Sequence, residues 1–331
     1  MCDKQRPSQA IMVDAVPIID FSAYSLDRES PDPEGFQKLI DDVHQALTTI
    51  GFMYLKNFGV PAQKIKDAFS YSKEFFFLPL ETKMKCVRPE NTNHGYVQLE
   101  REGLNPDRPF KDLKEAFNLS TASDKMPFPD EELPEFRTSL SDLFESFVPL
   151  HNRVLEVMAR GLNLEDPQYF VDRHKLIGTK HSQSTLRTLY YPSLANMEVK
   201  EDQVRCGEHT DYGGITLLFQ DSQAGLEVRN VEDKWIPATP IEGTVVVNIG
   251  DLMQRWTSDK LIASKHRVMI PLDQIKRQQD RQSMAFFGHP DNEAVIECID
   301  HSNKYSPTTG LAYINMRFAA TYKDATKLQT Y

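Results

Sequence analysis

The spacing of three side chains, His209, Asp211 and His266, restricts the fold of this chain more than any other feature of its sequence. His209 and Asp211 are separated by one residue within an apolar, β-branched stretch, which predicts a strand with both side chains on the same face. His266 lies far along the chain, at the start of another strand-like segment. One site can form from all three residues only if the fold brings distant strands together.

Two imidazoles and a carboxylate are a typical set of ligands for a catalytic divalent metal. Such a triad occupies one side of the metal and leaves the opposite positions open, which suits Fe(II) and oxygen chemistry. Catalytic zinc sites also use two histidines and a carboxylate with one open position. The triad alone therefore indicates a catalytic metal that is either iron or zinc.

Arg281 and Ser283 favour iron over zinc. They are separated by one residue in a strand-like segment shortly after His266, so the guanidinium and the hydroxyl are expected on the same face. A planar guanidinium fork with a hydroxyl beside it is a good receptor for a carboxylate. A carboxylate anchor near a metal suggests a bound keto acid, which chelates the metal at one end and pairs with the arginine at the other.

The order of short motifs along nearly the whole chain resembles that of the isopenicillin N synthase-like family of Fe(II)- and 2-oxoglutarate-dependent dioxygenases. The motifs lie at residues 16–21, 51–55, 75–79, 189–192, 209–211, 248–251, 266–268 and 281–283. The resemblance implies Fe(II) held by His209, Asp211 and His266, with O2 as the oxidant. It also implies 2-oxoglutarate bound by Arg281, Ser283 and the phenol of Tyr191. Plant members commonly carry an asparagine two residues before this tyrosine, where this chain has Leu189.

The family resemblance implies oxidation of a small organic molecule, with hydroxylation as the default and desaturation or ring closure as alternatives. An oxidase of the same family that uses no 2-oxoglutarate stays open, because Arg281 and Ser283 occur there too and bind a substrate carboxylate. A zinc hydrolase would need a general base beside the metal-bound water, and Glu208 is expected on the opposite face from His209. A non-enzymatic metal-binding module would be expected to have lost a ligand or the anchor, and this chain retains them.

Three further residues are candidates for a substrate pocket. Arg187 shares a strand face with Tyr191, Tyr212 directly follows Asp211, and Phe287 shares a face with Arg281. An aromatic platform with an arginine donor suits a flat, carbonyl-rich ring. Residues 207–221 and 239–248 are similar to thymine dioxygenases of fungal pyrimidine salvage. This similarity implies a pyrimidine base as substrate, with another planar heterocycle or a small phenolic as the second expectation.

Composition limits the partners and the compartment. The 331 residues carry a net charge of −10, which argues against a nucleic-acid partner because a phosphate backbone requires a basic face. No apolar run approaches the length of a membrane span, and the N-terminus has no signal-peptide core. The four cysteines show no paired spacing and are expected to be reduced, with Cys206 as a buried structural thiol. We expect a cytoplasmic monomer.

The pattern of elements predicts a mainly β protein with helices. Helices are expected after residues 31–33, after Pro61, at 79–85 and, longest, at 133–162, where Pro149 would kink or break the helix. Residues 91–134 are rich in Pro, Asn, Asp and Gly, and predict a lid with one strand or turn at 114–117. Short strands are expected at 186–191, 214–219, 226–229, 244–248, 268–271 and 283–288.

Evenly spaced short strands favour a closed or sandwiched β structure, and the resemblance implies a double-stranded β-helix, or jelly roll, flanked by helices. We expect one compact unit with an N-terminal helical and mixed region at 1–180 and a jelly-roll core with a C-terminal helix at 181–331. Asn248 and Asp251 are expected to form a turn or cap ahead of a helix beginning at Leu252, and Trp256 to lie in the core. His94, His181 and His289 have no spacing that indicates a role.

Overall fold

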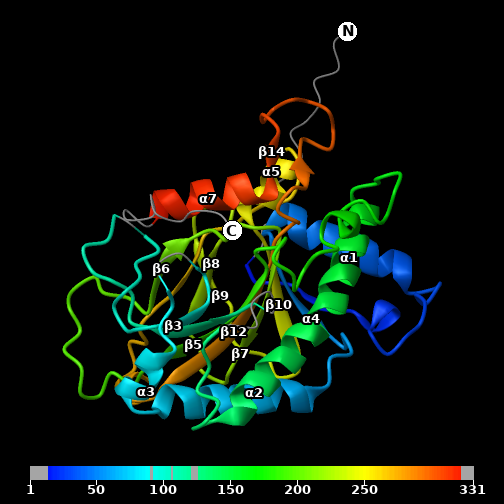
Figure 1. Cartoon of the computed structure of the whole chain (residues 1–331). Coiled ribbons are helices and arrows are strands. Elements are labelled where there is room, and N and C mark those ends of the chain that lie inside the picture. The colour runs from blue at the N-terminus through cyan, green and yellow to red at the C-terminus, as the bar shows by residue number, and fades with distance from the viewer. Residues whose placement is uncertain (1–13, 90–91, 106, 121–125, 322–331) are drawn as a thin grey trace.

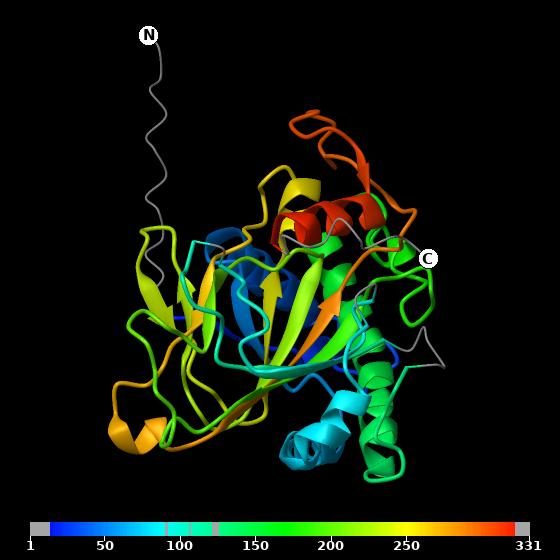
Figure 2. The ribbon, with the colours of Figure 1, turned by 60° about the vertical axis from the view of Figure 1, so that its left-hand side comes forward.

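The computed structural model describes residues 14–89, 92–105, 107–120 and 126–321 (Figure 1). Its largest feature is an eight-stranded sheet in the order β1-β2-β10-β7-β12-β5-β4-β3, which is antiparallel except for the β1–β2 pair. A second, antiparallel sheet has the order β6-β11-β8-β9. Figure 2 shows this smaller sheet beside the large one, at the left of the view.

The bounds of the elements are as follows. The large sheet consists of β1 (Ile18–Asp20), β2 (Phe52–Lys56), β10 (Thr244–Ile249), β7 (Ile215–Gln220), β12 (Arg281–Gly288), β5 (Thr185–Tyr191), β4 (Glu115–Leu119) and β3 (Gly95–Val97). The small sheet consists of β6 (Cys206–His209), β11 (His266–Val268), β8 (Leu226–Arg229) and β9 (Trp235–Pro237), and β13 (Val295–Ile296) pairs with β14 (Thr308–Thr309). The α-helices are α1 (Phe36–Thr49), α2 (Ala62–Phe77), α3 (Leu80–Lys85), α4 (Pro134–Gly161), α5 (Asp251–Trp256), α6 (Gln274–Arg277) and α7 (Gly310–Thr321).

Alternating side chains give the large sheet two different faces. Along β5, Leu186 and Tyr190 belong to the core shared with α1, α2 and α4, whereas Leu189 and Tyr191 belong to a second apolar cluster shared with the small sheet. Helices α1, α2 and α4 therefore cover one face of the large sheet (Figure 1). The other face is turned towards the small sheet, and this is the face that carries polar residues such as Arg187.

The two facing, mainly antiparallel sheets with flanking helices confirm the expected jelly-roll fold. Strands β1 to β4, from the first part of the chain, complete the large sheet at both of its edges. Pro149 lies inside α4 without interrupting it, and β11 ends at Val268, so a strand over 268–271 is not formed. Trp256 is fully buried in the core, as expected. Among the helices of the described residues, none has the length and apolar character needed to cross a bilayer.

Candidate active site

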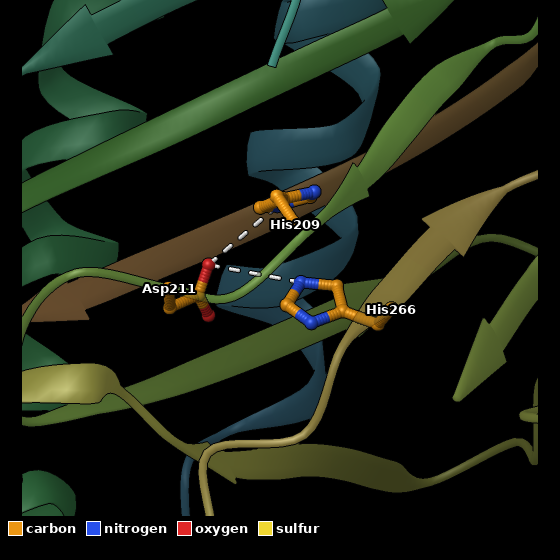
Figure 3. Close-up of side chains that lie close together, drawn as sticks. All are labelled: His209, Asp211 and His266. Carbon is orange, nitrogen blue, oxygen red and sulfur yellow. Dashed lines mark ion pairs between the residues drawn. The ribbon is translucent and has the colours of Figure 1, made fainter. Parts of the chain in front are cut away.

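Strands β6 and β11 bring His209 and His266 together. The two residues are paired across the antiparallel strands, and their ring centroids lie 4.3 Å apart. Asp211 lies outside β6, in the turn that follows it, so the expectation of a strand running through both His209 and Asp211 is wrong. The turn nevertheless directs the carboxylate towards both imidazoles (Figure 3).

The turn that carries Asp211 is held by the first residues of α5. The backbone N–H groups of Asp251, Leu252 and Met253 donate to the carbonyls of residues 211, 212 and 213, at 2.7, 3.2 and 3.3 Å. The first N–H groups of a helix have no partner within the helix. Here they find their partners in the turn, which positions Asp211.

The three side chains have the geometry and protonation that a divalent metal requires. Asp211 Oδ1 lies 3.8 Å from His209 Nε2 and 3.7 Å from His266 Nε2. The Nδ1–H of His209 donates to the Gly207 carbonyl at 2.8 Å, and that of His266 donates to the Ser264 carbonyl at 3.2 Å. Because each Nδ1 carries the proton, each Nε2 offers a lone pair on the side of Asp211. The ligand atoms all lie within 4.8 Å of one another, which fits one metal ion.

The second carboxylate oxygen of Asp211 is occupied by two buried donors. Thr216 Oγ1 donates to Asp211 Oδ2 at 2.6 Å, and Asn248 Nδ2 donates to it at 2.7 Å. Asn248 therefore supports the metal ligand. The sequence had suggested that it forms a turn or cap ahead of α5, but its side chain does not cap this helix. Burial alone would raise the pKa of Asp211, but His266, His209 and the two hydrogen bonds outweigh it and lower this pKa. Burial and the neighbouring His266 lower the pKa of His209, which keeps its imidazole neutral.

The face of the large sheet opposite the triad presents rows of side chains from adjacent strands. The rows that the register of β12 and β5 defines are Arg281 beside Tyr191, Ser283 beside Leu189, Ala285 beside Arg187, and Phe287 beside Thr185. All of these residues line one cavity together with His209, Asp211 and His266. Thr216, the donor to Asp211, is registered beside Phe287. The triad therefore lies near the Phe287 end of the cavity, and Arg281 lies at the opposite end.

Arg281 is a buried cation that donates to three neutral groups of the described residues. Its side chain is 1% exposed and donates to Gln220 Oε1 at 2.8 Å, to the Gln223 carbonyl at 3.1 Å and to Ser283 Oγ at 3.5 Å. Its guanidinium carbon lies 4.9 Å from the ring centre of Tyr191. In the part of the chain that the structure describes, no carboxylate forms an ion pair with Arg281. A buried charge normally requires an ionic partner, so this end of the cavity is suited to an anion.

Arg187, Tyr212 and Phe287 line the same cavity as the triad. The guanidinium of Arg187 forms an ion pair with Glu102, a carboxylate that is 4% exposed. The ring of Tyr212 lies 6.0 Å from that of Phe318 on α7, which also lines the cavity. The structure thus brings the three candidates into one space, and it adds the C-terminal helix to its wall.

Several cavity residues were not identified from the sequence. They are Lys114, Asn118, Thr216, Asn248, His289 and Phe318. Lys114 and Asn118 share the strand alternation of β4, a signal that could have placed them on one face. Phe318 belongs to a helix far from the motifs and had no such signal. Cys206 is buried, as expected, but it lines the cavity as well.

Comparisons with known proteins agree with this geometry. Residues 16–137 match the N-terminal region described as "non-haem dioxygenase in morphine synthesis", and residues 182–290 match the 2OG-Fe(II) oxygenase superfamily. A 2-oxoglutarate-dependent dioxygenase of Aspergillus rugulosus is 30% identical over 93% of this chain and 99% of its own length. A proline hydroxylase of Petromyces alliaceus is 32% identical over 89% of this chain and 94% of its own. The structure of the Neurospora crassa thymine 7-hydroxylase with α-ketoglutarate, another name for 2-oxoglutarate, and thymine superposes with a TM-score of 0.81 at 32% identity, covering 95% of this chain and 99% of that one.

Proposed function

Because this chain belongs to the isopenicillin N synthase-like family of Fe(II)- and 2-oxoglutarate-dependent oxygenases, we propose that it oxidises a small, planar, carbonyl-rich molecule. The chain is a 2-oxoglutarate- and Fe(II)-dependent oxidoreductase, and His209, Asp211 and His266 hold the iron. Iron is thus the metal that the triad alone left open between iron and zinc. When bound, iron and 2-oxoglutarate supply the oxidising chemistry, in which O2 is consumed and 2-oxoglutarate becomes succinate and CO2.

Arg281 carries the proposed binding mode of 2-oxoglutarate. Its charge is buried without an ionic partner among the described residues, and Ser283 and Tyr191 stand beside it. We place the distal carboxylate of 2-oxoglutarate on the guanidinium, where a charge-assisted, two-pronged contact can form. Burial raises the pKa of Tyr191, so its phenol is protonated and able to donate a further hydrogen bond. The keto-acid end then extends towards the triad.

The substrate is proposed to lie between Phe287 and the row formed by Arg187 and Asn118. Phe287 offers an aromatic face, and the Asn118 amide, registered beside Arg187, adds a donor and an acceptor. The ion pair with Glu102 fixes the Arg187 guanidinium in orientation. A flat ring with carbonyl and N–H groups matches this combination of stacking and hydrogen bonding. The thymine-bound relative supports a pyrimidine base such as thymine as the first candidate.

A substrate panel tests this proposal. Purified protein with Fe(II), ascorbate and 2-oxoglutarate would be offered nucleobases, small phenolics, proline and a terpenoid, and succinate would be measured against the oxidised product. We expect one-to-one succinate formation with a nucleobase, thymine first. Turnover of proline or the terpenoid, with no response to any nucleobase, would refute the substrate assignment and leave the enzyme class standing.

A further inference from the structure

Lys114 is a buried cation on the wall of the same cavity, and neither the motifs nor the proposed function gives it a role. It is 3% exposed and directly precedes β4. In the antiparallel pairing of β4 with β5, Glu115 is registered beside Tyr190, so the next position places Lys114 beside Tyr191. Tyr191 in turn is registered beside Arg281. The row therefore contains Arg281 on β12, Tyr191 on β5 and Lys114 just before β4, and all three residues line the cavity.

The ammonium of Lys114 is held in place by Asp112, in the segment before β4, and by Cys206 on β6. Its Nζ donates to Asp112 Oδ2 at 2.5 Å and to Cys206 Sγ at 3.6 Å. Asp112 is 2% exposed, and its other oxygen accepts the backbone N–H of Gly207 at 2.9 Å. The carbonyl of Gly207 is the acceptor for His209 Nδ1. One chain of hydrogen bonds thus connects Lys114 to the imidazole that holds the iron.

The ammonium keeps one donor for a ligand. A lysine has three N–H groups, and in the described part of the chain two partners, Asp112 and Cys206, account for two of them. Burial opposes the charge, but Cys206, Asp112 and Glu102 outweigh it and raise the pKa of Lys114, which keeps it protonated. A buried ion pair can often be replaced by apolar residues without loss of stability. Its presence on a cavity wall therefore suggests a task in binding.

The co-substrate has the charge that this row can receive. 2-Oxoglutarate is a dianion, and one of its carboxylates would be bound at the metal that the triad holds. The other carboxylate is proposed to bind Arg281, and it has two oxygens with several lone pairs that require donors. Leu189, in the next row, offers none. Tyr191 and Lys114 are the polar neighbours of Arg281 along its own row.

We propose that Lys114 is a second cationic contact for the distal carboxylate of 2-oxoglutarate, on the other side of Tyr191 from Arg281. This inference rests on the proposed co-substrate site at Arg281. It makes Lys114 a binding residue for the keto acid, and it makes Asp112 the residue that positions Lys114.

Binding of two keto acids tests the contact directly. Fe(II)-loaded protein would be titrated without oxygen with 2-oxoglutarate and with 2-oxopentanoate, which lacks the distal carboxylate, following the visible absorption of the iron–keto acid complex. In Lys114→Met, affinity for 2-oxoglutarate should fall by roughly 10- to 100-fold, whereas affinity for 2-oxopentanoate should change little. Lys111→Met is the matched control, because it removes the same charge from an exposed position three residues earlier. It should bind both keto acids like the wild type.

Two further variants distinguish a loss of the contact from a folding defect. Lys114→Arg keeps the cation and should retain most of the preference for 2-oxoglutarate, whereas Asp112→Asn/Lys114→Met removes both buried charges and should lose it. An unchanged preference for 2-oxoglutarate in Lys114→Met, or in the double variant where the single one does not fold, would overturn the inference. A wild-type protein that binds 2-oxoglutarate no better than 2-oxopentanoate would instead overturn the co-substrate site at Arg281.

Discussion

At the scale of single residues, the two carboxylate oxygens of Asp211 have different tasks. Oδ1 faces the two imidazoles, and Oδ2 accepts hydrogen bonds from Thr216 and Asn248. The donors fix the plane of the carboxylate before any metal arrives. This division explains why a single monodentate carboxylate can serve as the anionic ligand.

Replacing Asp211 tests the triad. Asp211→Ala removes the only anionic ligand, and we expect loss of bound iron and of turnover. Asn248 and Thr216, 2% and 4% exposed, also lose their acceptor. Stability should therefore fall by about 1–3 kcal/mol, without loss of the fold. Iron content by mass spectrometry and a urea denaturation curve measure the two effects. A variant that keeps one equivalent of iron and normal turnover would refute the assignment.

Asn248 should act on the metal although it does not touch it. Asn248→Ala leaves all three ligands in place but frees the Asp211 carboxylate to rotate, and we expect the affinity for Fe(II) to fall by roughly 10- to 100-fold. Thr244→Ala is the control, because it lies on the same strand and its hydroxyl donates to the Ile241 carbonyl, away from the triad. Competition with a metal chelator measures both variants. Equal iron affinity in the two variants would contradict the role given to Asn248.

Arg281 should govern the requirement for 2-oxoglutarate. Truncating one partner of a buried charge pair costs about 2–5 kcal/mol, which corresponds to an increase of roughly 30- to 5000-fold in the concentration required. Arg281→Ala should show this increase in the KM for 2-oxoglutarate, with a much smaller change in the KM for the organic substrate. The reverse pattern would place the anchor elsewhere.

At the scale of elements, two helices complete the site that the sheets begin. The start of α5 holds the turn of Asp211, and α7 contributes Phe318 to the cavity wall. Arg317 on α7 forms an ion pair with Asp251, and Asp251 accepts a hydrogen bond from Thr210 at 2.9 Å. Because Thr210 separates the two ligands His209 and Asp211, α7 is connected to the metal turn through α5. Figure 1 shows α7 and α5 at the same end of the molecule.

Phe318 should limit the size of the substrate. Phe318→Ala removes a ring that contacts Tyr212, and we expect kcat/KM for uracils with substituents larger than methyl to rise roughly tenfold relative to thymine. The KM for 2-oxoglutarate should stay the same. Met316→Ala on the same helix, at a position 55% exposed, serves as the control. An identical substrate ranking in the two variants would show that α7 does not shape the pocket.

At the scale of the whole molecule, three buried histidines join the helical layer to the sheet. His151 lies on α4, His174 follows α4 in the chain, and His289 follows β12; each is at most 8% exposed. The ring centroids of His151 and His174 are 5.0 Å apart. Burial lowers the pKa of all three, to about 4 for His174 and His289. The folded protein therefore keeps them neutral well below the ordinary histidine pKa.

These histidines should make the metal-free protein sensitive to acid. Their folded pKa values lie below the unfolded value of 6.5, so below pH 6.5 the unfolded chain takes up protons that the folded chain does not. The free energy of unfolding should fall as pH decreases from about 6.5 to 5, before the carboxylates with lowered pKa values contribute. In His151→Gln, the slope of the unfolding free energy against pH should be smaller, because about one proton fewer is taken up on unfolding. Urea denaturation at several pH values, with a chelator present, measures it; equal slopes would contradict the account.

The sequence identified the residues that the chemistry constrains, and it missed those that depend on folding. His209, Asp211, His266 and Arg281 stand out because their types and spacing suit only a few kinds of site. Asn248 had the local appearance of a cap residue, because its partner, Asp211, is remote in the sequence. The position of Asp211 in a turn follows from the hydrogen bonds of α5, which no local pattern reveals. Lys114 precedes a short strand, and its contacts with Asp112 and Cys206 show where its ammonium lies.

The most direct test of the central claim is an iron-edge anomalous diffraction measurement on crystals grown without oxygen with Fe(II) and 2-oxoglutarate. We expect one iron peak in contact with His209 Nε2, His266 Nε2 and Asp211 Oδ1. The keto acid should chelate that iron and place its distal carboxylate on Arg281. An iron peak away from these three atoms, or a keto acid whose distal carboxylate lies elsewhere than on Arg281, would contradict the account.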